Sequence, residues 1–351
     1  MKKQVLRTLT ASLATAFTLG AGLSVAHAKP VTLRVADILP NGSFIYNLST
    51  KPFMDEVEKR TNGEVTFKYF PGQQLGKAAD MLKLTQSGVT DIGYVGPSYL
   101  KDKMPLSAVL ELPGAFSNNS CEGFVALWNM THDGGFLQKQ EWDAQGVIPV
   151  LVLMTRHHIF VSKDKDINTM ADLEGLKMRS AGGAMARTQS EMGMVPVDLS
   201  APETYESMSR GTVDGTFWPA QSLFDYGLDD LVKTGSNKDH VAGIVLTYSI
   251  SKKAWDKLTP EQQKVIMEVG KEVSSTSCKN FDETEQNALK RIQDKGVKTL
   301  AFSDEDQKKM YEAYDRSAQA WAKSLDDRGR PGSEALKAMR EAVEQAKKEI
   351  Q

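Results

Sequence analysis

Three short segments near the start of the chain decide the fold class: Val31-Thr-Leu-Arg-Val-Ala36, Val65-Thr-Phe-Lys-Tyr69 and Asp91-Ile-Gly-Tyr-Val95. Each is rich in β-branched and aromatic residues, and turn-forming Pro and Gly follow the first two, as is typical of strands. The stretches between them, a helical one running on to Arg60 and a shorter one at Met81–Ser87, separate the strands. This β-α-β-α-β order predicts a mostly parallel sheet with helices on both faces.

The same alternation restarts in the second half of the chain. Val147–Met154 is almost continuously apolar, as a fully buried strand should be, and Ile159-Phe-Val161 follows it. Further strands are expected at 176–179 and after Gly215, and residues 241–249 form another β-rich run. Two α/β units joined by several chain crossings predict two lobes with mixed sheets and a central cleft, in which ligands collect at strand ends.

The last hundred residues are predicted to be helical. Thr259-Pro260-Glu261-Gln262 is a strong helix start, and this helix is expected to run to about Asp294 and to span both lobes. Another helix starts at Ser303, and a final one carries Leu336, Met339, Val343, Ala346 and Ile350 on one face. We therefore divide the mature chain into a first lobe (29–153 and 242–284) and a second lobe (154–241 and 285–351, with the C-terminal helices).

The first 28 residues are predicted to be a signal peptide. Lys2, Lys3 and Arg7 precede an apolar stretch that ends at Ala26-His27-Ala28, the small-x-small pattern that a signal peptidase accepts. Cleavage near Ala28 would release a periplasmic chain, and no later stretch is apolar enough to insert into a membrane. It would also move the formal net charge from −2 to about −5, which argues against a nucleic-acid partner.

Motifs for catalysis and metal binding are missing from the sequence. The five histidines make no HxxxH pattern, there is no G-x-S-x-G elbow, and Gly72-Gln-Gln-Leu-Gly76-Lys77 is one residue short of a phosphate loop. We therefore expect no enzyme and no cofactor. Cys121 and Cys278 are read more readily as two buried thiols than as a disulfide, although an exported compartment permits the pair.

Two segments of the second lobe indicate a family: Ala171-Asp-Leu-Glu-Gly-Leu-Lys-Met-Arg179 and Glu203-Thr-Tyr-Glu-Ser-Met-Ser-Arg-Gly-Thr-Val-Asp-Gly215, continued by Thr-Phe-Trp-Pro219. Together they resemble the solute-binding proteins of TRAP (tripartite ATP-independent periplasmic) transporters, the DctP-type receptors. That family pairs D-L-x-G-x-K-h-R (h apolar) with E-x-Y-x-x-h-x-x-G-x-V-D-G at a matching spacing. The turn at 39–43 and the loop at 71–76 extend the resemblance over essentially the whole mature chain.

The resemblance implies that Arg179 holds the carboxylate of the ligand. A guanidinium binds a carboxylate through two parallel hydrogen bonds, and inside a closed cleft such a pair is poorly screened. Without the resemblance, an exposed arginine at the end of a strand would be the commoner situation.

Position 218 departs from the family pattern. Many members have Asn before the Pro, whereas one keto-acid-binding subgroup has Glu-Trp there and uses the pair around a metal ion. This chain has Phe217-Trp218, and because a hard cation prefers oxygen ligands, we expect no metal. Trp218 is expected to form an apolar or aromatic wall of the site, with core packing as an equal alternative. Phe217 faces the other side of the strand and is more readily a core residue.

Six further residues are candidate ligand contacts by their places on loops or strand ends: Arg156, His157, Gln221, Phe44, Gln73 and Tyr99. Arg156 stands near the place of a second ligand-binding arginine in relatives. Local packing or turn formation is the alternative for each of the six.

The resemblance predicts a receptor that binds a small organic carboxylate between its lobes and delivers it to membrane TRAP permease subunits. Arg179 with Trp218 favours a monocarboxylate with an apolar or aromatic body. Two alternatives stay open at this point, namely a periplasmic sensor that presents its ligand to a signalling receptor, and a secreted enzyme.

Overall fold

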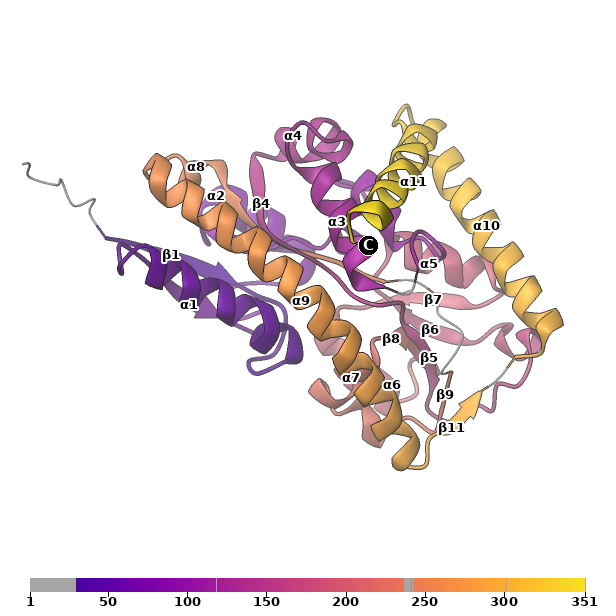
Figure 1. Cartoon of the computed structure of the whole chain (residues 1–351). Coiled ribbons are helices and arrows are strands. Elements are labelled where there is room, and N and C mark those ends of the chain that lie inside the picture. The colour runs from indigo at the N-terminus through magenta and orange to yellow at the C-terminus, as the bar shows by residue number, and fades with distance from the viewer. Residues whose placement is uncertain (1–29, 118, 237–240, 242, 301, 351) are drawn as a thin grey trace, which may run out of the picture.

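Two mixed β-sheets with helices around them form the two lobes of this computed structural model (Figure 1), which describes residues 30–117, 119–236, 241, 243–300 and 302–350. The predicted signal peptide lies outside the described residues. No helix in the described part of the chain is long and apolar enough to cross a membrane.

The first sheet has the strand order β2-β1-β3-β10-β4. Its strands are β1 (Val31–Ala36), β2 (Val65–Phe70), β3 (Ile92–Tyr94), β4 (Val147–Met154) and β10 (Val245–Ser251). β1 pairs in parallel with β2 and β3, whereas β10 runs antiparallel to both β3 and β4. Every residue of β10 is buried, because the sheet is covered on both faces there.

The second sheet has the strand order β11-β9-β5-β8-β6-β7. Its strands are β5 (Ile159–Ser162), β6 (Lys177–Ser180), β7 (Val195–Asp198), β8 (Gly215–Trp218), β9 (Thr234–Ser236) and β11 (Lys298–Leu300). β6 is parallel to β7 and β8, and β5 is antiparallel to β8 and β9. The prediction of two lobes with mixed sheets is confirmed, and one strand in each sheet reverses the parallel order.

Helices surround both sheets. The α-helices are α1 (Lys51–Arg60), α2 (Met81–Ser87), α3 (Ser120–Thr131), α4 (Asp143–Gln145), α5 (Gly183–Glu191), α6 (Thr204–Ser209), α7 (Ala220–Asp225), α8 (Lys252–Trp255), α9 (Pro260–Asp294), α10 (Asp304–Asp326) and α11 (Gly332–Glu349). Shorter 3₁₀ or π turns are η1 (Tyr46–Thr50), η2 (Ala78–Asp80), η3 (Pro97–Leu100), η4 (Leu106–Glu111), η5 (Gln138–Trp142), η6 (Met170–Leu173), η7 (Ala201–Glu203) and η8 (Leu228–Asp230).

Helix α9 connects the two lobes, as the sequence predicts. Thr259 and Gln262 form the expected capping box at its start. Near that end Ile266 packs into the core of the first sheet, and near the other end Ala288 packs into a core of the second sheet. The orange helix in Figure 1 accordingly runs from α1 to α7. The passages from β4 to β5 and from β9 back to β10 also connect the two sheets.

The two cysteines are joined, so the preference for free thiols was wrong. Cys121 of α3 and Cys278 of α9 form a disulfide with a Cα–Cα distance of 4.9 Å. The interpretation failed because the contact between α3 and α9, which brings the two positions together, is not visible in the local sequence pattern.

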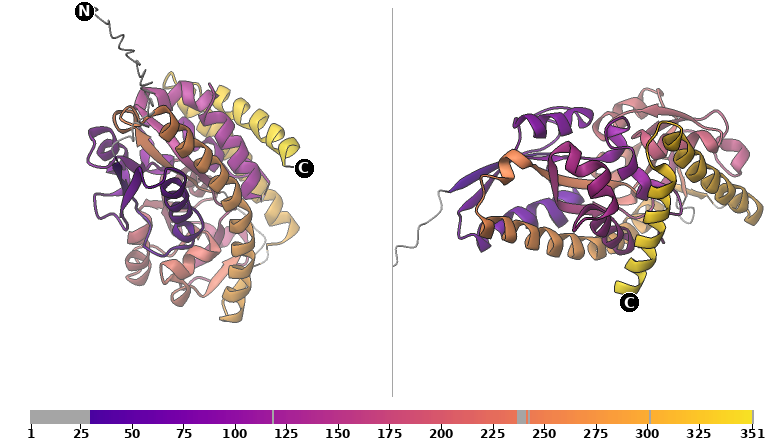
Figure 2. Two further views of the ribbon diagram at one scale, coloured as in Figure 1. Left: turned by 60° about the vertical axis from the view of Figure 1, so that its left-hand side comes forward. Right: turned by 90° about the horizontal axis from the view of Figure 1, so that it is seen from above.

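The C-terminal helices pack on different elements. α10 lies against α5, whereas α11 lies against α3 and η4. Both views in Figure 2 place these yellow helices at the periphery, away from β1. The boundaries proposed from the sequence for the two lobes remain a prediction, and below each lobe is named by its sheet.

Candidate functional site

Arg179 occupies the centre of the contact between the lobes. It lies in β6, where it pairs with Val197 of β7 and Thr216 of β8, and only 1% of its surface is exposed. The side-chain amide of Gln189 donates to its carbonyl oxygen at 2.9 Å, which ties the end of the strand to helix α5. The strand and this bond hold the backbone from which the guanidinium extends.

The Arg179 guanidinium makes its hydrogen bonds with neutral groups only. Nε donates to the Leu199 carbonyl at 3.0 Å, and Nη2 donates to the Tyr99 hydroxyl at 3.0 Å. Its central carbon lies 4.9 Å from the centre of a Trp218 ring, a cation–π contact. Among the described residues no carboxylate forms an ion pair with it, and Nη1 has no hydrogen-bond partner. A buried charge is costly without a counter-charge, so this position favours an anionic ligand.

Arg179 lines a cavity of about 50 Å³ that is built from both lobes. The first lobe contributes Ile38, Leu39, Ile45, Tyr94, Tyr99 and, beside or within β10, Ile244 and Leu246. The second lobe contributes Ala201, Trp218, Pro219, Ser222 and Tyr226 with Arg179, and the crossing after β4 adds Thr155 and His158. The walls are mostly aliphatic and aromatic, with few polar groups, as in sites for small organic ligands.

Strand β8 turns two adjacent aromatic residues to opposite sides. Phe217 is 1% exposed and packs against Phe160 in the core, with ring centres 5.7 Å apart. Trp218 lies on the cavity side, where Tyr226 meets it edge-on at 5.4 Å. This is the alternation of a strand, and it puts the indole next to the guanidinium.

The two histidines after Arg156 have different surroundings. His158 lines the cavity, and its pKa falls to about 3 because burial and the charges of Arg179 and His157 disfavour the imidazolium. It is therefore neutral at physiological pH, and its Nε2 lies 3.3 Å from the Thr155 hydroxyl. His157 lies instead against the ring of Phe116, 4.7 Å between centres, and is not part of the cavity wall.

Three other candidates, Phe44, Gln73 and Gln221, have contacts outside the cavity. Phe44 packs edge-on against Phe281 of α9, and the Gln73 side chain accepts the Ala78 N–H at 3.0 Å within its own loop. Gln221 accepts a hydrogen bond from Arg291 of α9 at 3.2 Å.

Arg156, which follows β4 in the chain, lies close to Glu285 of helix α9. Burial raises the pKa of Glu285 to about 7, and the charge of Arg156 opposes that rise. Glu285 accepts hydrogen bonds from the first two N–H groups of α7, Ala220 at 2.6 Å and Gln221 at 3.2 Å. Arg156 thus stands beside the carboxylate that fixes α7 on α9.

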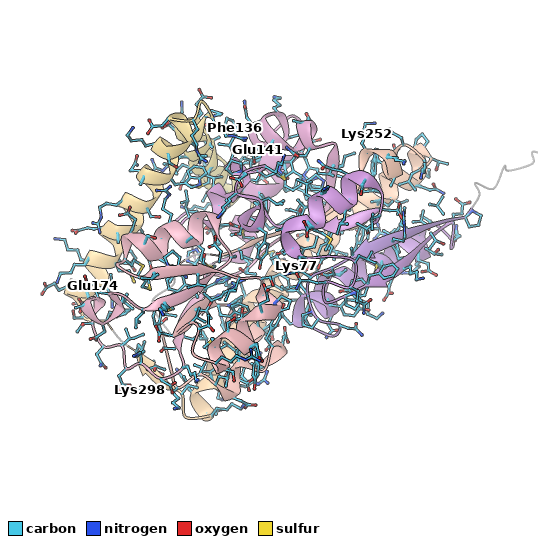
Figure 3. The ribbon with its side chains drawn as sticks, turned by 180° about the vertical axis from the view of Figure 1, so that it is seen from behind. Lys77, Phe136, Glu141, Glu174, Lys252 and Lys298 are labelled. Atoms are coloured by element: carbon cyan, nitrogen blue, oxygen red, sulfur yellow. A yellow bond between two sulfur atoms is a disulfide. The ribbon has the colours of Figure 1, made fainter. Side chains whose placement is uncertain are left out.

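A second hollow of about 270 Å³ shares Tyr99 with the cavity and opens on its outer side. Lys77 and Lys101 line it from the first lobe, and Asp198 and Glu203 from the second. Lys101 and Asp198 form an ion pair at 3.0 Å across the lobes, while Lys77 stands at the lobe boundary in Figure 3. Charged side chains of both signs therefore lie next to Tyr99, whose hydroxyl accepts a hydrogen bond from Arg179.

Several cavity residues carry no sequence signal that predicts a ligand contact. Tyr94 ends a short strand, and Tyr226 follows a six-residue helix, so each reads as ordinary packing. No group of three or more His, Cys, Asp or Glu side chains in the described ranges is arranged to hold a metal ion.

The two lobes, the helix that spans them and the interlobe cavity with a buried cation define a ligand-binding receptor of the two-lobed type. Residues 35–324 match the family model for bacterial extracellular solute-binding proteins, family 7 (DctP), and the chain belongs to that family. It is therefore a TRAP-type solute-binding receptor, and its relatives are binding proteins and not enzymes.

Known relatives cover nearly the whole chain. The C4-dicarboxylate-binding periplasmic protein of Rhodobacter capsulatus is 25% identical, over 83% of this chain and 86% of its own. The TRAP solute-binding protein of Rhodoferax ferrireducens, solved with copurified benzoate, superimposes with a TM-score of 0.83 at 22% identity, covering 92% and 100% of the two chains. A marine metagenome protein solved with 3-hydroxybenzoate gives 0.82 at 22% identity, covering 91% and 99%. The two structural matches support the fold.

Proposed function

We propose that this receptor binds a small organic carboxylate with an apolar or aromatic body in the interlobe cavity and delivers it to a membrane TRAP permease. The observation that carries the proposal is the buried guanidinium of Arg179, which forms no ion pair with any carboxylate of the described residues. Hydrogen bonds from Ser200 and, to a smaller extent, the charge of Arg179 lower the pKa of Glu203, but the Arg179 and Glu203 side chains form no ion pair. A ligand carboxylate at Nη1 would supply an ion-pair partner, and Tyr99 could add a hydrogen bond from its hydroxyl.

The rest of the cavity supports an apolar body for the ligand. Trp218, Ile38 and Leu246 are buried wall residues that offer surface and no charge. The benzoate and 3-hydroxybenzoate held by the two structural relatives have this composition, a carboxylate on a flat apolar ring. We also propose a periplasmic location, with cleavage near Ala28, because the family works outside the cytoplasm.

Arg179→Ala tests the proposal directly. Loss of two charge-assisted hydrogen bonds to a carboxylate, roughly 1.5–3 kcal/mol each, should weaken binding more than about 100-fold. Calorimetric titration with a panel of organic acids measures the change. Arg210→Ala is the matched control, because Arg210 is exposed and forms an ion pair with Glu206 one helical turn away. Equal affinities of the Arg179 variant and the wild type would refute the assignment.

Delivery to a permease needs a separate measurement. Uptake of the identified acid by cells that carry the neighbouring permease genes should depend on this receptor and on Arg179. Uptake that persists without the receptor would contradict this part of the proposal.

A further inference from the structure

Two aromatic side chains of the cavity wall each keep one polar atom without a partner. The indole Nε1 of Trp218 and the hydroxyl of Tyr226 are sealed from solvent, and neither makes a hydrogen bond to any described residue. Buried polar groups in folded proteins are nearly always hydrogen-bonded, so an unpaired one calls for an explanation. Here two occur side by side, with ring centres 5.4 Å apart.

Both atoms are hydrogen-bond donors under working conditions. An indole N–H only donates. Burial raises the pKa of Tyr226 well above its ordinary value, so that hydroxyl keeps its proton. The indole therefore needs an acceptor, and the Tyr226 hydroxyl can donate to the same acceptor.

The nearby protein acceptor is already occupied. Asp37 is buried beside the cavity, and its carboxylate accepts from the hydroxyls of Tyr69 at 2.8 Å and Tyr248 at 2.6 Å and from the Leu39 N–H at 2.9 Å. The polar side chains Thr155, His158 and Ser222 also line the cavity, but none of them makes a hydrogen bond to either donor. An acceptor for the two donors must therefore come from the ligand side of the cavity.

The position of the pair relates it to Arg179. Trp218 stacks on the guanidinium, and Tyr226, directly after α7, meets the indole edge-on. A ligand whose carboxylate binds Arg179 would lay its body along Trp218. An oxygen on that body then comes to the two donors while its carbon frame stays against the aliphatic wall.

We propose that Trp218 and Tyr226 form a second polar subsite that selects carboxylates bearing one further oxygen acceptor, a hydroxyl, keto or ether group, on an apolar or aromatic body. This inference rests on the proposed function of Arg179. It separates the ligand both from plain hydrocarbon acids, which leave the donors unpaired, and from polyhydroxylated sugar acids, whose many hydroxyls the aliphatic wall cannot pair.

Matched ligand pairs that differ by one hydroxyl test the subsite. We would titrate the purified mature protein with benzoate and its three ring-hydroxylated isomers, and with phenylacetate and mandelate. At least one hydroxylated acid should bind about tenfold more tightly than its parent. Tyr226→Phe removes only the hydroxyl, and Trp218→Phe removes the indole N–H while keeping a smaller aromatic ring, so each should bring that affinity ratio close to one.

Tyr205→Phe serves as the control, because Tyr205 is 41% exposed on α6 and lies outside the cavity wall. It should leave the ratio unchanged, and thermal unfolding of all variants checks that they fold. The subsite is overturned if no hydroxylated acid is favoured by the wild type, or if the preference survives in both phenylalanine variants. If no acid binds at all, or if binding is insensitive to Arg179→Ala, the proposed function itself fails.

Discussion

Asp225→Ala should weaken ligand binding although Asp225 does not line the cavity. Its carboxylate, at the end of α7 in the second lobe, accepts the N–H of Phe44 in the first lobe at 3.1 Å. Phe44 begins the helical run that continues through α1. A carboxylate there accepts a hydrogen bond from a backbone N–H that has no partner within the helix, and its negative charge is favourable at the positive end of the helix dipole. A hydrogen bond to a charged group is worth about 1.5–3 kcal/mol, and this one forms only when the lobes meet.

Ser222 of α7 and Tyr226 directly after it line the cavity. The contact between Asp225 and Phe44 therefore couples ligand binding to closure of the lobes. Loss of about 2 kcal/mol from the closed form should raise Kd about 30-fold, mainly through faster dissociation, because the open form still admits ligand. Asp225→Asn keeps a neutral acceptor and should lose less than Asp225→Ala.

Titration calorimetry and stopped-flow dissociation with the tightest acid of the panel measure the effect, and small-angle scattering reports the fraction of closed molecules. Asp230→Ala is the control, because Asp230 is exposed and forms an ion pair with Lys295, outside the cleft. Unchanged affinity and dissociation rate in Asp225→Ala would show that the contact does not hold the lobes together.

Two further predictions concern stability. The disulfide between Cys121 and Cys278 closes a loop with a sequence separation of 157. In the chain-entropy model, the variant with both cysteines replaced by serine should lose about 5 kcal/mol of unfolding free energy, which urea denaturation measures. A difference within error of zero would exclude that contribution. Burial raises the pKa of Glu285 from 4.5 to about 7, so the folded protein retains a proton that the unfolded chain releases. Unfolding free energy should therefore fall as pH rises from 4.5 to 7, and Glu285→Gln should flatten this slope, whereas Glu283→Gln on the exposed face of α9 should not.

Local sequence signals predicted many elements because they are local in origin. β1, α2 and β4 begin and end at the predicted residues, since apolar runs and turn residues mark their limits. The strand expected at 241–249 is observed as β10 (Val245–Ser251). Its direction, antiparallel to β3 and β4, was not predictable, because it depends on the crossing from the other lobe and not on its own residues.

For the site too, features that depend on local sequence could be predicted, whereas features that depend on distant contacts could not. Arg179 was found through a motif, and the alternation of Phe217 and Trp218 follows from strand geometry, so both could be placed from the sequence. Tyr226 could not, because its contact with Trp218 depends on how α7 folds back after Pro219. The choice between His157 and His158 depends on the twist of the chain between the lobes, which no pattern of residues reveals.

The groups at the interface explain why closure should depend on ligand. Closing the lobes around water alone would bury the charge of Arg179 without an ion-pair partner and leave Trp218 and Tyr226 without acceptors. The Lys101–Asp198 pair cannot offset this, because both side chains are about half exposed and such pairs contribute little. Asp225 and the apolar walls favour closure but are indifferent to what the cavity holds. A carboxylate with one further oxygen, as proposed above, would satisfy Arg179, Trp218 and Tyr226 together, so we expect the ligand to determine whether the closed form is stable.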